Sequence, residues 1–356
     1  MNDNAARIAE YLNTFYNPEE WPALLTQAEE WAVTRPLEGL KVLDATPVYR
    51  NTLGKYMALL AGGAEVYVPA RNKLPGDPAV LRSVTDFGIQ YARKGDDFFD
   101  IVLDCAGQFC RLNPTLGFCE LTRSGVERYE HARRRVFVAD SGRIKRIETV
   151  LGTGDGFFRA LDKLGHGDVS NRRLLIIGYG KVGRGIAFYA REKGMKVTIA
   201  DTDDKSGELP GEFSFVDANN VEAINEAILR SWCTVTATGH ISALRRQLNN
   251  TAAAVTNSPV LLANMGVEDE YSSQIPTERV LNNKRPLNFI LEEPTAMRYI
   301  ETTMALHNAC GLELLTQDLP NKCMPPSPDV EEHLLNIVCT KGLIGNDIRR
   351  LDHEMA

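Results

Sequence analysis

The sequence feature that most constrains the fold is a glycine-rich turn at residues 178–183, which reads Gly-Tyr-Gly-Lys-Val-Gly. A short apolar run, 174–177, comes directly before the turn, and a segment of helical composition, 185–193, follows it. A second apolar run lies at 196–200. A strand, a glycine turn, a helix and a second strand in this order make up a dinucleotide-binding βαβ unit. The sequence therefore predicts a parallel sheet that binds a dinucleotide at this turn.

Each glycine of the turn has a physical task in such a unit. Gly178 permits the tight turn, Gly180 lets a pyrophosphate approach the backbone, and Gly183 lets the helix pack closely against the strand. The start of the helix, which includes Lys181 and Val182, offers free N–H groups and a partial positive charge to the phosphates. We expect all five residues to contact the cofactor.

An acidic residue, Asp201, closes the second apolar run. A carboxylate at this place accepts hydrogen bonds from the hydroxyls of the adenosine ribose and repels a 2′-phosphate. The expected cofactor is therefore NAD and not NADP. The alternative is a domain of the same winding that has lost its ligand, but the three glycines together with the acid favour a nucleotide site.

Strand-like and helix-like segments alternate through most of the chain, which is typical of parallel sheets covered by helices. The expected strands are 41–44, 64–68, 100–104, 136–139, 174–177, 196–200, 213–216, 233–236 and 260–263. We predict an α/β fold of two doubly wound Rossmann-like domains with a cleft between them. Residues 1–150 plus 295–356 form the first domain and 151–294 the second. Outside the sheets, we expect helices at 122–134, 295–315 and 329–341 and a polar tail at 342–356.

The composition fits an ordinary globular protein and argues against several other classes. A chain of 356 residues is long enough for about two domains. The formal net charge of −7 argues against a nucleic-acid partner, because phosphate binding needs a concentrated basic surface. No apolar run approaches the roughly 18 residues of a membrane span, and the N-terminus lacks the pattern of a signal peptide. The 7 cysteines and 6 histidines show neither CxxC nor HxxxH spacing. We expect a cytoplasmic protein with reduced thiols, no metal site and no membrane or nucleic-acid partner.

Beyond these patterns, the stretch Asn171–Asp201 resembles the NAD domain of S-adenosylhomocysteine hydrolase. Shorter segments elsewhere resemble the same family, namely 60–66, 103–107, 121–126, 138–141, 236–239 and 264–266. The resemblance implies that the first domain binds substrate, that the second binds NAD, and that the cleft holds the chemistry. It implies hinges near residues 150 and 294. Scaffolds of this kind commonly dimerise, so we expect a homodimer.

The resemblance adds four cofactor contacts outside the glycine turn. Thr238 and Gly239 belong to a loop that borders the cofactor in that family. Asn264 and Asn288 resemble family positions around the nicotinamide carboxamide.

The chain departs from the family at most of its catalytic positions. In that family, NAD oxidises a ribose hydroxyl of the substrate, and a lysine, carboxylates and histidines move the protons. Apolar, thiol or otherwise different residues stand at these positions here: Pro47, Cys105, Leu121, Ile144, Val267 and Glu293. Without a proton acceptor within hydrogen-bond reach, general base catalysis at the same atoms has no agent. We therefore expect that the protein does not hydrolyse S-adenosylhomocysteine.

Other titratable groups could replace the missing ones. His240 follows the loop that borders the cofactor, where a histidine could face the nicotinamide and relay a proton. Lys145 and Glu148 form a second acid–base candidate, with Lys145 one residue out of the family's register. For His240, the alternative is an ordinary surface position. Cys105 could act as a nucleophile only beside a base, so we expect a buried structural thiol there.

Four arginines, Arg50, Arg123, Arg143 and Arg146, lie at or just after the expected ends of strands in the first domain. Ligands bind at such places in open α/β sheets, and guanidinium groups pair well with carboxylates and phosphates. We therefore expect a small anionic substrate. The alternative for each arginine is a solvated surface position.

Three functions fit this pattern. The first is an NAD-dependent oxidoreductase that acts on a small anionic substrate. The second is a non-catalytic NAD-binding protein that senses the cofactor, and the third is a hydrolase or lyase that uses NAD transiently. The presence of replacement acid–base groups favours the first.

Overall fold

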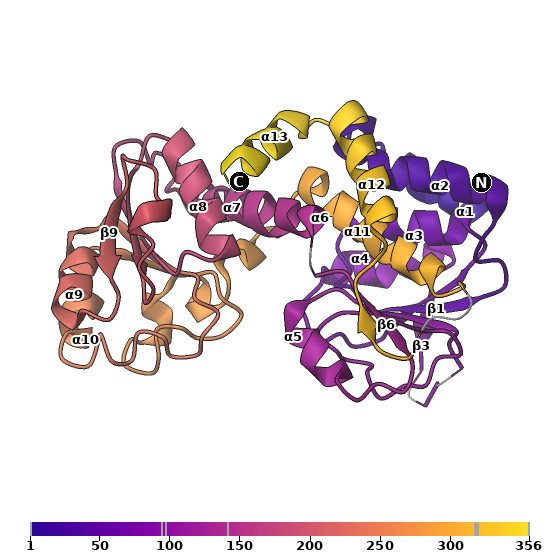
Figure 1. Ribbon diagram of the computed structural model, residues 1–356, viewed down its shortest axis with the longest axis horizontal. Helices are drawn as coiled ribbons and strands as arrows, with labels where there is room; N and C mark the ends of the chain where they lie inside the picture. Colours follow the sequence, from indigo (N-terminus) through magenta and orange to yellow (C-terminus); the bar gives the residue numbers. More distant parts are fainter. Residues whose placement is uncertain (1, 94, 97, 141, 317–319, 355–356) are drawn as a thin grey trace. The chain divides into compact units, whose positions relative to one another are not determined.

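The computed structural model describes residues 2–93, 95–96, 98–140, 142–316 and 320–354 (Figure 1). The chain divides into two compact units. Unit 1 comprises Met1–Ile147 and Met297–Ala356, and unit 2 comprises Glu148–Ala296. Unit 1 is therefore built from both ends of the chain, and unit 2 is an insertion into it.

Unit 1 contains a seven-stranded parallel sheet in the order β12-β6-β5-β4-β1-β2-β3. Its strands are β1 (Lys41–Asp44), β2 (Glu65–Pro69), β3 (Gln90–Ala92), β4 (Ile101–Asp104), β5 (Gly117–Glu120), β6 (Arg135–Val138) and β12 (Cys323–Met324). Every residue of the central strands β4 and β5 is buried. Helices cover both faces of such a sheet, which is why these strands lack the alternation of a half-exposed strand.

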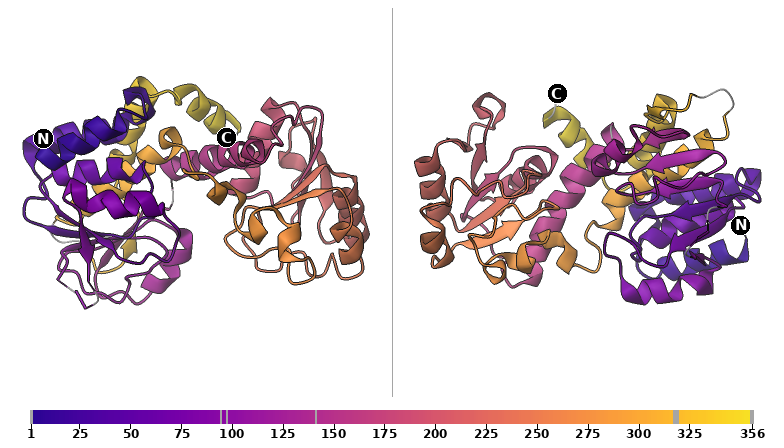
Figure 2. Two further views of the ribbon diagram at one scale, coloured as in Figure 1. Left: turned by 180° about the vertical axis from the view of Figure 1, so that it is seen from behind. Right: turned by 90° about the horizontal axis from the view of Figure 1, so that it is seen from below.

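Two helices, α3 (Thr52–Ala61) and α11 (Met297–Glu313), are buried along most of their length in unit 1. α11 packs against α3, β4 and β5 and also against α2 and α12. In the left view of Figure 2, the yellow α12 lies beside the indigo N-terminal helices, and it packs against α2. The other helices of unit 1 are α1 (Asp3–Leu12), α2 (Pro22–Thr34), α4 (Pro78–Ser83), α5 (Arg123–Val126), α6 (Arg143–Arg146), α12 (Pro328–Lys341) and α13 (Gly345–Glu354), with short 3-10 helices at Pro18–Glu20, Val84–Phe87 and Glu127–Tyr129.

Unit 2 contains a five-stranded parallel sheet in the order β11-β10-β7-β8-β9. Its strands are β7 (Arg173–Ile177), β8 (Lys196–Asp201), β9 (Ser214–Asp217), β10 (Cys233–Thr236) and β11 (Leu261–Asn264). Its helices are α7 (Thr153–Lys163), α8 (Lys181–Glu192), α9 (Val221–Arg230) and α10 (Ala252–Thr256), with 3-10 helices at Ser206–Glu208, Thr277–Arg279, Leu281–Lys284 and Leu287–Ile290. A π-helix, Ile147–Gly152, leads into the unit.

The two faces of the unit 2 sheet bury separate cores. Leu174 and Ile176 of β7 point into one apolar cluster, and Leu175 and Ile177 point into the other. Successive strand residues face opposite sides of a sheet. β7 is therefore apolar throughout because it is covered on both faces.

Both sheets confirm the predicted doubly wound α/β fold. In unit 2, the central β7 is flanked by β8 and β10, so the winding reverses beside it. In unit 1, β1 is flanked by β2 and β4 in the same manner. Ligands of such sheets bind at the carboxyl ends of the strands where the winding reverses. That end of β7 carries the glycine turn.

The predicted polar tail at 342–356 is wrong, because α13 occupies most of it. Ile344, Ile348 and Leu351 are buried at helical spacing. The helix expected at 122–134 is also wrong in extent, since α5 ends at Val126 and only one 3-10 turn follows. The strands β3, β5 and β12 were not predicted from the sequence. β5 lacks β-branched residues, and its neighbours β4 and β6 hold it in the sheet.

Among the described residues, no helix is both long enough and apolar enough to cross a membrane.

Candidate functional site

The glycine turn follows β7 in a conformation that requires glycine at two positions. Gly178 has a φ of +97°, and a Cβ atom there would lie 2.7 Å from the carbonyl oxygen of Ala237. A Cβ at Gly183 would lie 1.9 Å from the carbonyl oxygen of Gly178. A Cβ at Gly180, in contrast, would meet no described atom within 4 Å. Close packing explains the first two glycines, whereas Gly180 leaves open space in front of α8.

The N-terminus of α8 faces this open space. The helix begins at Lys181, and Gly180 is its N-cap residue. Gly180 has no side chain that could accept hydrogen bonds from the first-turn amides. The side chain of Val182 packs against the apolar core of unit 2 and is partly buried. Free N–H groups and the positive end of the helix dipole make this turn suitable for phosphate oxygens.

Asp201 connects the end of β8 to the glycine turn. Its Oδ2 accepts a hydrogen bond from the Tyr179 N–H at 2.7 Å, and its Oδ1 accepts one from the Asp203 N–H at 3.2 Å. An ionised carboxylate can accept about four hydrogen bonds. Asp201 therefore keeps acceptor capacity for a ligand.

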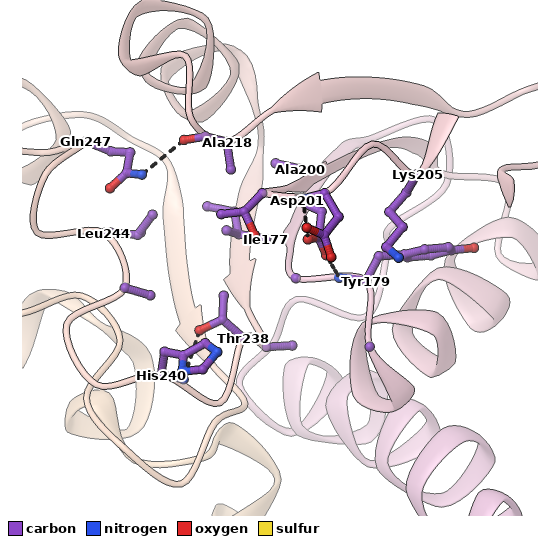
Figure 3. A pocket seen from close by; sticks show the side chains of 16 residues that line it. Ile177, Tyr179, Ala200, Asp201, Lys205, Ala218, Thr238, His240, Leu244 and Gln247 are labelled. Atoms are coloured by element: carbon purple, nitrogen blue, oxygen red, sulfur yellow. Dashed lines mark hydrogen bonds between the residues drawn. The ribbon is translucent and has the colours of Figure 1, made fainter. Parts of the chain in front are cut away.

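Gly178, Tyr179, Gly180 and Asp201 border one pocket of about 520 Å³ in unit 2. Its wall comes from the glycine turn, the end of β8, and the segment after β10 that contains Thr238, His240, Leu244 and Gln247. In Figure 3, Tyr179 and Lys205 lie at one end of the pocket and Gln247 at the other. The pocket thus has the glycine turn, suited to phosphate, and the carboxylate of Asp201, suited to ribose hydroxyls, in one wall. Its other end is less polar.

The segment after β10 is held by Glu270, a residue that the sequence analysis missed. Its carboxylate accepts hydrogen bonds from the N–H groups of Thr238 at 2.9 Å and Gly239 at 2.7 Å. A Cβ at Gly266 would lie 2.0 Å from Oε1 of Glu270, so this glycine makes room for the carboxylate. Burial raises the pKa of Glu270, and the hydrogen bonds oppose that shift. No local pattern marks this residue, because its partners lie about 30 positions away in the sequence.

The substitution Glu270→Gln is expected to loosen the loop at Thr238 and Gly239. A glutamine offers one acceptor oxygen, and its NH₂ group would face a backbone N–H that then has no acceptor. Hydrogen exchange of these two amides should accelerate by roughly tenfold, which corresponds to about 1.4 kcal/mol and lies within the cost of an unpaired buried donor. The exposed Glu278→Gln in the same unit is the control. Unchanged exchange in Glu270→Gln would show that the carboxylate does not hold the loop.

The other predicted cofactor contacts lie at different depths. Thr238 lines the pocket. Gly239, the next residue, is exposed and is not part of the pocket wall. Asn264 is fully buried; its Nδ2 donates to the carbonyl oxygens of Glu268 and Lys284 at 2.7 and 2.6 Å. Asn288 is also buried and donates to a backbone carbonyl at 3.3 Å. Neither asparagine borders the pocket beside Asp201, and their contact with a cofactor stays a prediction.

His240 lines the same pocket as Asp201 and is exposed. Its backbone N–H donates to the Thr238 Oγ1 at 3.1 Å. The expectation that it faces the nicotinamide stays a prediction.

Lys145 and Glu148 lie on either side of the boundary between the units. Lys145 is buried in α6 of unit 1, and Glu148 begins unit 2 within the π-helix. Lys145 is close enough to His307 of α11 for its charge to contribute to the lowered pKa of that buried imidazole, after burial itself and Lys55. Their joint acid–base role stays a prediction.

Two of the four predicted substrate-binding arginines already contact other side chains. Arg143 forms an ion pair with Asp352 of α13, and the guanidinium of Arg50 lies 4.1 Å from the ring centre of Phe15. Arg123 and Arg146 are exposed. The latter pair is therefore better placed to meet an anion from solution.

Two carboxylates at strand ends of unit 1 organise the adjoining loop. Asp104 accepts the N–H groups of Cys105 and Phe109, each at 2.8 Å, and the hydroxyl of Tyr129. Burial raises the pKa of Asp104 to about 6, and these hydrogen bonds oppose the shift. Glu120 accepts the N–H groups of Ala106 and Gly107 at 3.0 and 2.9 Å. Both side chains are fully buried, and so is almost all of Cys105.

A buried ion pair joins β1 to α3 in unit 1. Lys55 pairs with Asp44, and both side chains have no exposed surface. The Lys55 Nζ also donates to the Thr46 Oγ1 at 3.1 Å, and the Asp44 Oδ1 accepts the Thr46 N–H at 2.8 Å. Burial lowers the pKa of Lys55, and Asp44 opposes that change. The pair fixes the end of β1 beside the place where the winding of the sheet reverses.

In the part of the chain that the structure describes, no group of three or more histidine, cysteine, aspartate or glutamate side chains is arranged to hold a metal ion.

Comparison with known proteins finds relatives of low sequence identity. No family model matches it. The adenosylhomocysteinase of Thermoplasma acidophilum is 25% identical, with 79% of this chain and 74% of that protein covered. The adenosylhomocysteinase of Thermoplasma volcanium is 23% identical, with 92% of each chain covered. This protein is a divergent relative of the adenosylhomocysteinases.

Two further matches come from another hydrolase and from a solved structure. The S-inosyl-L-homocysteine hydrolase of Methanopyrus kandleri is 26% identical to this chain, with 74% of this chain and 68% of that protein covered. Among solved structures, a dipicolinate synthase chain from Bacillus halodurans is 11% identical, with a TM-score of 0.49 and coverage of 79% of this chain and 99% of that one.

Three of the positions at which we expect the sequence to depart from the family's catalytic residues have buried side chains. Cys105, Leu121 and Ile144 are at most 7% exposed. Val267 is 77% exposed. Leu121, Ile144 and Val267 have no proton to exchange, whatever their exposure.

Proposed function

We propose that this protein binds NAD in the pocket of unit 2 and acts as an NAD-dependent oxidoreductase on a small anionic substrate. One observation carries the proposal: the glycine turn, up to the N-cap residue Gly180 of α8, and Asp201 border a single pocket at the place where the winding reverses. Dinucleotides bind at this place in doubly wound sheets.

The residues present fit NAD. The open space at Gly180 admits a pyrophosphate to the N–H groups of Lys181 and Val182. The free acceptor capacity of Asp201 suits the two hydroxyls of the adenosine ribose, and its charge disfavours a 2′-phosphate. Lys205 also borders the pocket, but its ammonium group lies 3.3 Å from a carboxylate oxygen of Glu208. Because Lys205 is already paired with Glu208, its ammonium group would stabilise a 2′-phosphate less than an unpaired lysine would.

The chain's own residues would bind and orient the reactants. NAD, when bound, supplies a hydride acceptor. His240 and the pair Lys145 and Glu148 are the groups that could take the proton released when an alcohol or amine is oxidised. The exposed Arg123 and Arg146 would bind the anionic substrate, with Arg50 and Arg143 available only if their present contacts open. We further propose a cytoplasmic homodimer that does not hydrolyse S-adenosylhomocysteine.

A second candidate is a non-catalytic NAD-binding protein. It is favoured by the use of polar groups in unit 1 for internal contacts. Asp104 and Glu120 bind backbone amides, and Arg143 pairs with Asp352. These groups stand near strand ends, where a substrate site would otherwise need them.

The test begins with the nucleotide that accompanies the purified protein. We expect mass spectrometry of the denatured protein to detect NAD, or titration calorimetry of the nucleotide-free protein to give a Kd for NAD at least tenfold below that for NADP, a difference of about 1.4 kcal/mol. Tighter binding of NADP would contradict the proposal.

Turnover assays on the same sample separate the candidates. An oxidoreductase would form NADH with some member of a panel of small hydroxy acids, amino acids and phosphorylated alcohols. A protein that binds NAD but never reduces it fits the second candidate. Release of homocysteine from S-adenosylhomocysteine would show that the protein is a hydrolase in spite of its altered catalytic positions.

A further inference from the structure

The loop that follows β8 contains a cation, Lys205, whose side chain borders the same pocket as Asp201. In Figure 3, this side chain points toward the end of the pocket that Tyr179 and Asp201 border. In sheets of this kind, an arginine near the ribose carboxylate accommodates the 2′-phosphate of NADP, and lysine also binds phosphates as a point charge. Lys205 therefore lies where it could support the cofactor that Asp201 disfavours.

The charge of Lys205 is neutralised by Glu208. One carboxylate oxygen of Glu208 lies 3.3 Å from the Lys205 Nζ, and the other forms an ion pair with Arg184 of α8. Arg184, followed by Lys205, lowers the pKa of Glu208, so this carboxylate is ionised at neutral pH. Glu208 does not itself border the pocket. Any effect that it has on a ligand must therefore pass through Lys205.

Arg184 holds Glu208 in this position. Arg184 is the fourth residue of α8, close to the helix N-terminus, where the positive end of the helix dipole disfavours a cation. An anionic partner is favourable there, and Glu208 supplies it. The guanidinium of Arg184 also lies 4.4 Å from the ring centre of Tyr179, a buried residue of the glycine turn. The ion pair between Arg184 and Glu208 is thus anchored to the turn itself.

We propose that Glu208 is a second determinant, besides Asp201, of the preference of the cofactor site for NAD over NADP, and that it acts by neutralising Lys205. This inference rests on the proposed binding of NAD. Without Glu208, the cations Lys205 and Arg184 would offset the two carboxylates that border this end of the pocket, Asp201 and Asp203. With Glu208 ionised, negative charge is in excess there. A phosphate with nearly two charges responds to this excess more strongly than a ribose hydroxyl does.

The test compares Glu208→Gln with the unaltered protein by titration calorimetry of NAD and NADP on the nucleotide-free full chain. Glutamine keeps the shape of the side chain and removes its charge, and the position is 46% exposed, so the fold should be retained. The ratio of the Kd for NADP to the Kd for NAD should fall by about tenfold, equivalent to about 1.4 kcal/mol. Glu278→Gln is the matched control, because it removes the same charge from an exposed position of unit 2 that does not border the pocket.

Two further measurements separate the charge of Glu208 from a structural role. The double variant Lys205→Met with Glu208→Gln should return the ratio to within about threefold of its unaltered value, because the lysine that Glu208→Gln sets free is gone. Raising the salt concentration from about 0.05 M to about 0.5 M should reduce the difference between Glu208→Gln and the unaltered protein to less than about threefold, since salt screens exposed charges. A structural role alone would give neither result.

Each outcome decides the inference. An unchanged ratio in Glu208→Gln would overturn it and leave the NAD site intact. A fall in the ratio that persists in the double variant, or that Glu278→Gln reproduces, would overturn it as well, because Lys205 would then not be the group through which Glu208 acts. Absence of binding by both dinucleotides, or tighter binding of NADP by the unaltered protein, would overturn the inference together with the proposed function.

Discussion

The substitution Gly180→Val is expected to weaken NAD binding by about a hundredfold, equivalent to about 2.8 kcal/mol, while the protein remains folded. A Cβ at Gly180 meets no described atom within 4 Å, and its φ of −77° is open to any residue. A valine side chain would therefore fit the free protein and fill the space that the pyrophosphate needs. Loss of a glycine at an N-cap should cost less than about 1 kcal/mol of stability.

Calorimetry and a thermal unfolding curve measure the two effects separately. Gly211→Val is the matched control, because Gly211 also has open space around it but does not border the pocket. Gly183→Val gives the opposite pattern, since its Cβ would collide with the turn and the unit should fail to fold. A folded Gly180→Val protein with unchanged affinity would show that phosphates do not pass over this turn.

The second large effect concerns the stability of unit 1. Lys55→Met should lower its free energy of unfolding by about 3–5 kcal/mol, because Asp44 would remain buried without its partner charge. The double variant Asp44→Leu with Lys55→Met should recover most of this loss, since apolar replacement of a whole buried pair is often tolerated. Lys322→Met, at an exposed position of the same unit, is the control.

Tryptophan fluorescence during denaturant unfolding can report this effect for unit 1 alone. Trp21 and Trp31 lie in unit 1, and Trp232 lies in unit 2 and can be replaced by phenylalanine. A single variant as stable as the unaltered protein would mean that Asp44 accepts a proton or water at little cost. In that case the ion pair would not be the main connection between β1 and α3.

Local sequence patterns predicted the parts of the structure that depend on local interactions. The strand, turn and helix at 174–193 follow from glycine geometry and apolar periodicity over about 20 residues, and the structure has them in place. The doubly wound form of the two sheets was predicted from the alternation of strand-like and helix-like segments along the chain. β5 was missed because its strand conformation is imposed by two neighbours and not by its own residues.

Long-range contacts explain what the sequence could not predict about the site. Glu270 holds Thr238 and Gly239 across about 30 residues, and Arg143 is engaged by Asp352 from the far end of the chain. A pattern of charges near strand ends shows which residues could meet a ligand, but it does not show which are already occupied by the protein.

The insertion of unit 2 into unit 1 has a consequence for the order of folding. Unit 1 needs α11, since Glu301 accepts the N–H of Leu24 and the carbonyl of Ala305 accepts Gln27 across nearly 280 residues. Closing so long a loop costs conformational entropy that grows with the logarithm of its length. In folded unit 2, α7 packs against the segment at Pro294, so the ends of the insertion already lie together. Folding of unit 2 therefore shortens the effective loop between the two segments of unit 1. We expect unit 2 to fold first and so to lower the entropic cost of completing unit 1.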